Sequence, residues 1–422
     1  MAKTQTRTGS NARVTAAQPS VAQRLAASAL NGGFRAFSGQ SRDFYLLLSV
    51  TGVLAAIGIV MVFSASYVDA LAANAWAYTD GLHQFIFVIA GSLMLTLFLL
   101  WPIAWVQRLV MPIYVGATVV QISVFAIGKE VNGNKNWIAL PGGFSLQPSE
   151  FLKIALALFL AWWIAKNRDE LDDRKMWVQA GIRVGFPIAI VLFQKDLGTS
   201  IVIVAMLIGL AVLAGLPRKL LMFVLLAAAV ITPLLLRFGS STRWPRIQAW
   251  LFPNLPDPMG YNWQQDHGVW AIAAGRLGGV GLGNSKMKWS WIPEIQNDFI
   301  FAVIGEETGM LGCLVIIALF ITLVFTMIRI ANRATDLFSK LFVQGVAVWI
   351  AAQAIINIAV VLDLLPVLGV PLPLISSGGS SMIATLSAIG IVLGVERNNH
   401  AGRDVGVAPR GFGRATISTR RR

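Results

Sequence analysis

The chain has 422 residues, of which 56% are hydrophobic and 13% are charged, and its mean hydropathy is +0.68. A soluble domain cannot bury so large an apolar fraction in one core, so the composition excludes that class and predicts an all-α polytopic membrane protein. The formal net charge is +14, but the basic residues are spread over loops and tails, which argues against a nucleic-acid-binding domain. The single cysteine, Cys313, excludes an intrachain disulfide and a thiolate metal cluster.

The chain begins and ends with basic, polar segments. Residues 1–42 lack the apolar core of a signal peptide and are interpreted as a disordered basic cytoplasmic tail, and residues 397–422 are interpreted as a basic cytoplasmic tail. Between them, residues 43–396 are expected to form a membrane domain, because its apolar runs approach the roughly 20 residues that cross a bilayer. Ten such runs are predicted, around residues 44–66, 84–100, 109–127, 152–164, 182–193, 200–213, 220–236, 299–327, 341–362 and 375–395.

The loop charges predict the orientation of these ten spans. With the N-terminus in the cytoplasm, the cytoplasmic loops carry most of the loop cations: Arg108, Lys166, Arg168, Arg174, Lys175, Arg218, Lys219, Arg329, Arg333 and Lys340. Cytoplasmic loops are enriched in Lys and Arg, so this pattern agrees with ten spans and two cytoplasmic termini. The seventh and eighth spans are then joined by a long outer loop, residues 238–297.

This long outer loop combines recurring tryptophans with cations such as Arg246 and Arg276. Indole favours the headgroup zone, and the cations suit a phosphate-bearing lipid, although they also fit an interfacial segment whose arginines only snorkel. The loop ends in a glycine-rich stretch, followed by Glu294 and Asp298. The apolar run that starts at Phe299 then carries Glu306 and Glu307, and acids so close to hydrocarbon need a reason. For Asp298 the simplest reason is a helix N-cap.

Three further polar segments lie at outer ends of spans. Pro148 is expected to start a helix on which Glu150 and Lys153 share one face, either as a structural ion pair or as a functional one. Asp196 is placed to cap the helix that follows it. Before the last span, three prolines precede residues 376–381, which indicates either a broken helix with exposed N–H groups or a proline-started helix capped by serine.

These segments carry a resemblance to a known family. The strings NGNKNWIAL, LQPSEFLKIAL, QKDLGTSIVI, GLGNSKMKWSWIPEIQNDFIFAVIGEETGMLG and LLPVLGVPLPLISSGGSSMIATL, in this order, resemble the SEDS family, which includes FtsW and RodA. The resemblance implies a ten-helix glycosyltransferase of the bacterial plasma membrane that polymerises lipid II together with a class B penicillin-binding protein. GLGNS, the following MKW and the long basic N-terminal tail are more similar to FtsW, which implies septal synthesis with other divisome proteins.

The resemblance also assigns site residues. It makes Asp298 the catalytic acid and Glu150, Lys153 and Asp196 its polar companions. Together with the residue chemistry it gives these candidates for substrate binding: Glu150, Lys153, Asp196, Lys135, Trp137, Arg246, Arg276, Glu294, Ser376, Ser377, Gly378 and Gly379. The chain departs from the family where Asn136 stands in place of the usual Arg, with Lys135 one residue earlier, and where Ser377 replaces an aromatic residue. The partner is expected against the later spans, near Trp349 and Ala352.

Glycan polymerisation needs a base for the attacking hydroxyl and cations for the departing diphosphate. One carboxylate without a second nucleophile predicts a single displacement with inversion. No His, Asp and Glu cluster with metal spacing is visible, so no cofactor is assigned and a divalent ion stays open. The alternatives are a lipid II flippase or other transporter, an elongation polymerase of the RodA type, and a non-enzymatic division scaffold.

Overall fold

The fold was analysed in a computed structural model, which describes residues 37–72, 79–131, 134–141, 144–239, 243–254, 257, 259–289 and 291–404. The predicted tail residues 1–36 and 405–422 lie outside these ranges. Residues 1–40 form a unit of their own, and the following concerns the unit from residue 41 onward. Its helices are α2 (Arg42–Ala72), α3 (Thr79–Leu100), α4 (Ile103–Ile127), α5 (Pro148–Lys166), α6 (Arg174–Phe193), α7 (Leu197–Leu213), α8 (Arg218–Gly239), α9 (Arg243–Leu251), α10 (Trp263–Gly275), α11 (Ile300–Asn332), α12 (Leu337–Val361) and α13 (Gly379–Asp404).

The structure confirms an all-α polytopic membrane protein. Within the described residues, eight helices are long and apolar enough to cross a bilayer. Each of the ten predicted runs overlaps a helix, but α7 is a shorter apolar helix of 17 residues and α8 is not among the eight. Ten spans therefore stay a prediction. Helix α13 continues to Asp404, so the predicted C-terminal tail begins inside a helix.

The helices differ in how much of their surface other helices cover. About 22% of the most apolar window is buried in α3 and in α4, against 72% in α5, 67% in α12 and 83% in α13. Helix α12 packs on α5, α7 and α11, and α13 packs along α3. Side chains on α5, α12 and α13 are therefore largely shielded from lipid, which allows these helices to carry polar groups.

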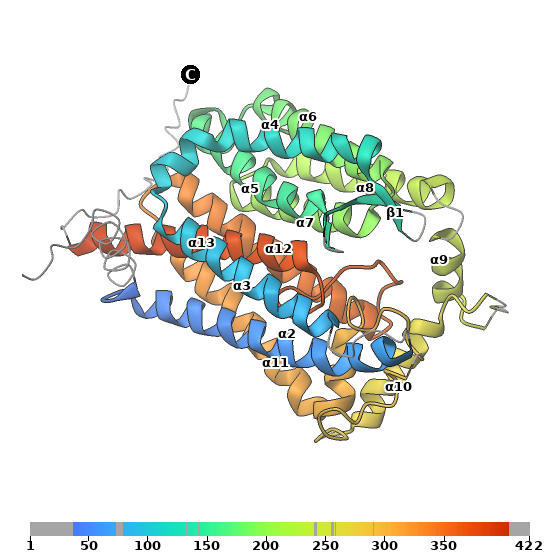
Figure 1. Cartoon of the computed structure of the whole chain (residues 1–422). Helices are drawn as coiled ribbons and strands as arrows, with labels where there is room; N and C mark the ends of the chain where they lie inside the picture. Colours follow the sequence, from blue (N-terminus) through green and yellow to red (C-terminus); the bar gives the residue numbers. More distant parts are fainter. Residues whose placement is uncertain are drawn as a thin grey trace, which may run out of the picture. The chain divides into compact units, whose positions relative to one another are not determined.

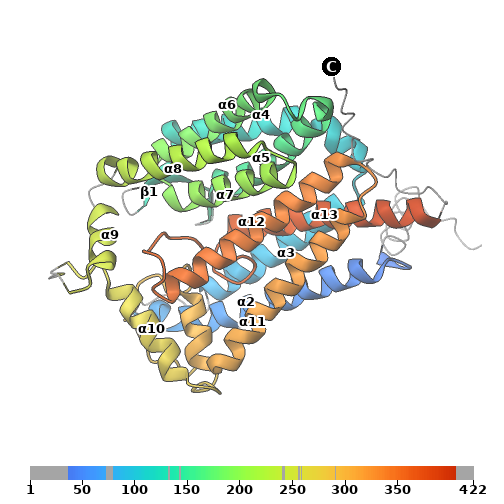
Figure 2. The ribbon, with the colours of Figure 1, turned by 180° about the vertical axis from the view of Figure 1, so that it is seen from behind.

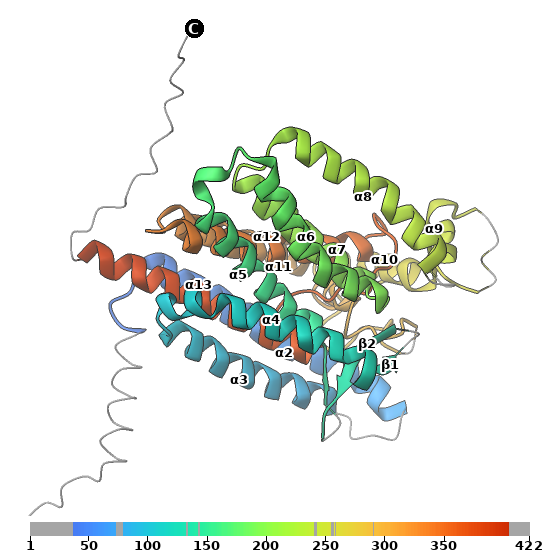
Figure 3. The same ribbon diagram turned by 90° about the horizontal axis from the view of Figure 1, so that it is seen from above.

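The predicted long loop contains two helices, α9 and α10, which the sequence did not predict. The segment before α5 was likewise not predicted to form strands, yet it forms an antiparallel sheet of β1 (Lys129–Val131), β2 (Asn134–Ala139) and β3 (Ser145–Leu146), with β2 in the centre. Figures 1, 2 and 3 all show α9, α10 and β1 at one common end of the helices, which is called the outer end below.

Residues 362–378, called the proline loop here, connect α12 to α13 at this end. Pro366, Pro371 and Pro373 all lie in the loop, not in the first turn of α13, which starts at Gly379. The serine hydroxyl of Ser376 accepts a hydrogen bond from the backbone N–H of Leu372 at 2.8 Å, inside the loop. The proline-started alternative is wrong, because α13 starts only at Gly379 and Ser376 closes a local turn inside the loop, whereas the broken helix stays a prediction.

Candidate active site

Asp298 lies directly before α11 but does not cap it. The N-cap residue of α11 is Phe299, and no side-chain hydrogen bond caps the helix. Within the described residues, the Asp298 carboxylate forms no ion pair and receives a hydrogen bond only from its own backbone N–H. The simplest structural role, a helix cap, is therefore excluded, and a half-buried carboxylate is left with capacity for a proton or a ligand.

The surroundings of Asp298 raise its pKa from 3.8 to about 6. The main cause is burial, which disfavours the charged form, and the negative charge of Glu294 adds to it. The own-backbone hydrogen bond and the positive charge of Arg246 act in the opposite direction. Two of the predicted binding residues, Glu294 and Arg246, thus lie near enough to Asp298 to influence its charge, and both are exposed to solvent.

Asp196 caps α7 as predicted, since its Oδ1 accepts the backbone N–H of Thr199 at 3.1 Å. Its other oxygen, Oδ2, accepts from Gln147 Nε2 at 2.8 Å, from Asn136 Nδ2 at 3.2 Å and from Ser149 Oγ at 3.3 Å. Each carboxylate oxygen thus has at least one donor. Asp196 is 7% exposed, and both of its carboxylate oxygens are already hydrogen-bonded to protein groups. These bonds hold the starts of α5 and α7 next to β2.

Glu150 and Lys153 form a buried ion pair on α5. Lys153 Nζ lies 2.8 Å from Glu150 Oε2, and both residues are at most 2% exposed. The same ammonium donates to Gln353 Oε1 at 2.9 Å and lies 4.7 Å from the centre of the Trp349 ring. The i, i+3 pair predicted from the sequence is confirmed, and its cation is held on three sides by protein groups.

Helix α12 contributes site residues that sequence reasoning missed. Trp349 Nε1 donates to Gln353 Oε1 at 2.7 Å, and Gln353 Nε2 donates to the carbonyl of Pro371 at 2.9 Å. One turn further, Asn357 Nδ2 donates to the carbonyls of Asp298 and Val370, each at 2.8 Å. The signal was present in the sequence, because buried amides spaced i, i+4 within an apolar span share one helix face.

The proline loop joins the outer ends of several helices. The backbone N–H of Ser377 donates to the carbonyl of Gln296 at 2.9 Å, and Gln84 Nε2 on α3 donates to the carbonyl of Ser376 at 3.2 Å. Just after the loop, Ser380 Oγ accepts the backbone N–H of Gln147 at 2.9 Å. The loop and the first turn of α13 thus connect a residue next to Asp298 with Gln147, which binds Asp196.

Of the two predicted glycines at the start of α13, Gly378 and Gly379, only Gly379 has a packing role. A Cβ at Gly379 would lie 2.4 Å from the ring of Phe87 on α3, so this glycine permits the close approach of two helices. A Cβ at Gly378 would meet, among the described atoms, only the Cβ of Ser381 at 3.6 Å. Gly378 therefore remains the more open of the two positions.

Three predicted binding residues stand apart from these contacts. Lys135, Asn136 and Trp137 follow one another on β2, and successive side chains of a strand point to opposite faces. Asn136 points to Asp196, so Lys135 and Trp137 point to the other face. Lys135 Nζ donates to the carbonyl of Phe125 at the end of α4, at 2.6 Å. Arg276 is exposed at the end of α10, where its carbonyl accepts the N–H of Met310.

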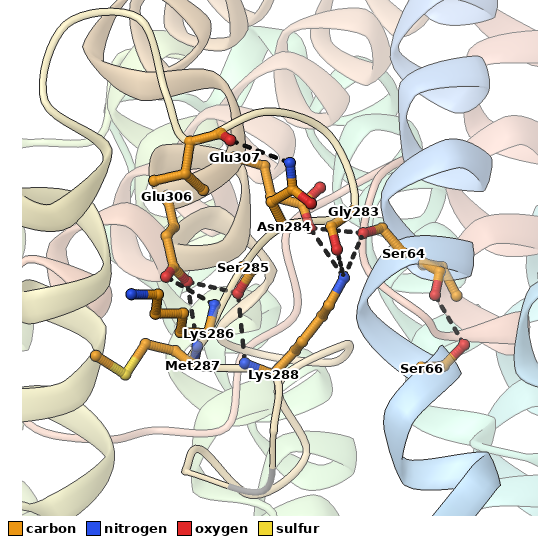
Figure 4. A network of polar contacts seen from close by, with 12 residues as sticks. Ser64, Ser66, Gly283, Asn284, Ser285, Lys286, Met287, Lys288, Glu306 and Glu307 are labelled. Atoms are coloured by element: carbon orange, nitrogen blue, oxygen red, sulfur yellow. Dashed lines mark hydrogen bonds and ion pairs between the residues drawn. The ribbon is translucent and has the colours of Figure 1, made fainter.

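The two acids inside α11 have a structural explanation (Figure 4). Glu306 accepts from Ser285 Oγ at 2.5 Å and from the backbone N–H groups of Lys286 and Met287 at 2.9 and 3.3 Å. Glu307 Oε1 accepts from Ser64 Oγ on α2 at 2.6 Å and lies 3.4 Å from Lys288 Nζ (Figure 4). The two carboxylates therefore bind the glycine-rich segment, residues 278–288, to α11, and Glu307 also binds α2.

Strained backbone gathers at the outer end. The non-glycine residues with positive φ in the described chain are Lys195, Arg276, Glu294, Asp363 and Leu374. Each lies next to a helix end or in a loop near the groups above, where a left-handed conformation costs about 1 kcal/mol or more. Such strain persists where surrounding contacts fix it, and it concentrates at functional sites. No cluster of three His, Cys, Asp or Glu occurs within the described residues, and the metal question stays open.

Comparison with known proteins agrees with this geometry. A family model described as "Cell cycle protein", covering FtsW, RodA and SpoVE, matches residues 44–401. A probable peptidoglycan glycosyltransferase FtsW of Trichlorobacter lovleyi is 38% identical over 84% of this chain and 92% of that protein. The protein of the same description from Mycobacterium tuberculosis is 34% identical over 86% of this chain and 70% of its own length.

A solved structure gives the same result at the level of the fold. A chain from a study of how a peptidoglycan synthase complex coordinates polymerisation and crosslinking is 25% identical, with a TM-score of 0.67 over 86% of this chain and 99% of that one. The matched residues include every polar segment of the outer end described above. The chain belongs to the FtsW/RodA/SpoVE family of cell cycle proteins, the SEDS family that its motifs resemble.

Proposed function

We propose that this chain, a peptidoglycan glycosyltransferase like its curated relatives, polymerises lipid II with Asp298 as the general base. The observation that carries the proposal is the state of the acids at the outer end. Glu150 is paired with a lysine, and Asp196 and Glu306 are held by several donors each. Asp298 has neither restraint, and its pKa of about 6 suits a group that must accept a proton near neutral pH.

In the proposed step, the Asp298 carboxylate takes the proton of the acceptor 4-hydroxyl. The oxygen attacks the anomeric carbon of the donor sugar while the bond from that carbon to the diphosphate breaks, and the diphosphate leaves with the electron pair. One displacement inverts the anomeric centre. Arg246 is the cation best placed to stabilise the leaving group, because its charge already acts on Asp298. Arg276 and Lys135 remain candidates for more distant parts of the lipid.

In this proposal, buried residues support the substrate site. Glu150, Lys153 and Asp196 fix the starts of α5 and α7, and Ser376, Ser377, Gly378 and Gly379 form the adjoining backbone. Glu294 lies four residues before Asp298, and Trp137 on β2 stays a candidate for a more distant contact with the lipid. No metal site is assigned in this proposal.

The proposed setting is septal cell-wall synthesis, with both termini in the cytoplasm and a class B penicillin-binding protein as partner. The FtsW descriptions of the relatives and the synthase complex among the solved structures support this assignment. Of the two positions expected near the partner, Trp349 is 0% exposed and binds Gln353, whereas Ala352 is half-buried, so the partner interface stays a prediction. On α12, Ile355 is 66% exposed and is the better position for a photocrosslinker.

The test uses purified full-length protein, fluorescent lipid II and gel separation of the glycan products, with and without the partner. Asp298→Asn should lower polymerisation at least about a hundredfold, the low end for loss of an acid–base group. Expression and thermal stability should stay near wild type, because Asp298 does not cap α11. Glu294→Gln, in the same segment and exposed, is the matched control and should cost much less.

The other outcomes identify the alternatives. Asp298→Asn with more than about a tenth of wild-type polymerisation would show that another group is the base. Leaflet exchange of lipid II without polymer would identify a flippase. Neither activity with the partner present would leave a scaffold of the division machinery.

A further inference from the structure

A row of three buried side chains runs along one face of α12. Trp349, Gln353 and Asn357 follow the i, i+4, i+8 spacing and are 0%, 1% and 1% exposed. The row begins at the Lys153 ammonium, which donates to Gln353, and ends at the Asp298 carbonyl, which accepts from Asn357. It is called the α12 ladder below.

The orientation of the last amide is fixed by its partners. Asn357 Nδ2 uses its two hydrogens on two carbonyls, those of Asp298 and Val370, so exchanging its oxygen and nitrogen would lose both bonds. Within the described residues, its Oδ1 is buried and accepts no hydrogen bond. A buried acceptor without a donor costs about 1–3 kcal/mol, so stability alone does not explain an asparagine at this position.

The Asp298 carbonyl accepts none of the backbone hydrogen bonds that form α11. The first helical bond at this end joins the N–H of Ala302 to the carbonyl of Phe299, one residue later. Earlier in the segment before the helix, the carbonyls of Trp291 and Pro293 accept hydrogen bonds from Trp263 and Gln264 on α10. Residues 296–298 are held by two further tethers, the hydrogen bond from the N–H of Ser377 to the Gln296 carbonyl and the one from Asn357 to the Asp298 carbonyl. Both of these tethers bind them to the proline loop, because Asn357 also binds Val370.

We propose that Asn357 is the positioning residue that holds Asp298 in its reactive orientation, and that the α12 ladder joins this residue to the Lys153 ion pair. This inference rests on the proposed function. The asparagine touches the backbone of Asp298 and not its carboxylate, so it sets the place of the base without contributing to proton transfer. Small displacements of a catalytic group are costly, since an error of about 1 Å can lower a rate about a hundredfold.

The experiment compares variants of the full-length protein in the lipid II polymerisation assay. Asn357→Leu keeps the side-chain size and removes both donors, whereas Asn357→Ser keeps one donor. Gln344→Leu is the matched control, because Gln344 is a buried amide on the same helix, 8% exposed, and its Oε1 accepts no hydrogen bond within the described residues.

Asn357→Leu should lower kcat about 10- to 100-fold while the KM for lipid II changes less than about threefold, with Asn357→Ser between it and wild type. The acid limb of the pH–rate profile should also move to lower pH, because a loosened Asp298 carboxylate gains water. Gln344→Leu should change none of these.

Three results would overturn the inference. One is an Asn357→Leu protein with wild-type kcat and an unchanged pH profile. Another is failure of both Asn357 variants to fold, which would make the residue a purely structural one. The third is a lower melting temperature with unchanged kinetics at a permissive temperature. Asp298→Asn is measured in parallel: if it is inactive while Asn357→Leu is normal, the base stands and only the positioning role falls, whereas an active Asp298→Asn removes the proposed function itself.

Discussion

At the scale of single residues, the charge of Asp298 is set by groups on two different segments. Burial raises its pKa, Glu294 raises it further, and Arg246 lowers it. A general base works in its deprotonated form, so the rate should fall as pH drops through the pKa of Asp298. The pH at which activity is half-maximal therefore reports the neighbours of this carboxylate.

The first prediction uses the opposite signs of these two neighbours. Wild-type polymerisation should rise with pH, be half-maximal at about pH 6, and level off about one pH unit above this midpoint. Glu294→Gln removes a negative charge that raises the pKa, so the midpoint should move to lower pH. Arg246→Gln removes a positive charge that lowers the pKa, so the midpoint should move to higher pH. Initial rates at saturating lipid II across pH 4.5–8.5 (about four pH units) measure both shifts, and equal midpoints in all three proteins would contradict the assignment.

At the scale of elements, the site depends on contacts between helices that are far apart in sequence. The Lys153 ammonium on α5 faces an amide oxygen and an indole ring of α12, and both groups favour a cation. The glycine-rich segment lies against α11, where two buried carboxylates fasten it. Contacts of this kind fix the helices that surround the base relative to one another.

The second prediction concerns the Glu150–Lys153 pair. Exchanging the two residues, Glu150→Lys with Lys153→Glu, keeps an ion pair but sets a carboxylate against Gln353 Oε1 and the face of Trp349. We expect the exchange to recover neither stability nor polymerisation beyond the single variants, since breaking a buried pair costs about 3–5 kcal/mol and the new contacts are repulsive. Melting temperature and gel assay measure the two properties. Full recovery of both stability and polymerisation would show that the pair needs only its own mutual attraction and not the contacts with α12.

The third prediction concerns the glycine-rich segment. Gly279 has a φ of +79°, and a Cβ there would lie 2.2 Å from the Glu307 carbonyl, so Gly279→Ala should displace the segment and destabilise the protein by about 1–3 kcal/mol. The neighbouring Gly278→Ala is the control, because a Cβ there meets no described atom within 4 Å. Thermal unfolding in detergent measures the difference. Equal melting temperatures would contradict the packing observed here.

At the scale of the whole molecule, the most enclosed helices carry the polar contacts. Helices α5, α12 and α13 are the most buried, and the ion pair and the amides of the ladder lie on the first two. Helices α3 and α4 are apolar, and only 22% of the most apolar window of each is buried against the rest of the protein. This distribution keeps charges and amides away from lipid.

The fourth prediction tests the orientation of the chain. Cysteine at Leu282, which is 63% exposed at the outer end, should react with an impermeant maleimide added outside intact cells. Cysteine at Asp172, exposed in the loop between α5 and α6, should react only after the membrane is opened. The native Cys313 is 4% exposed and gives little background. External labelling of Asp172→Cys would invert the proposed topology.

The sequence by itself determined the class, the family and the positions of the apolar helices. Long apolar runs specify helices because the backbone must satisfy its hydrogen bonds internally in lipid. Local spacing likewise determined the Glu150–Lys153 pair and the Asp196 cap, since both depend on residues three or four apart. Position also drew attention to Asp298, the acid before the apolar run, but its catalytic role was implied by the family resemblance.

Only the tertiary structure decided which of these polar groups are free and which are occupied. Glu306 and Asp196 are held by donors 19 to 60 residues away in sequence, and no local pattern specifies such pairings. Trp349, Gln353 and Asn357 gain their roles from carbonyls of the proline loop and of Asp298, which come together only when α5, α11, α12 and α13 pack. The raised pKa of Asp298 has the same origin, because burial and distant charges are properties of packing and not of the local sequence.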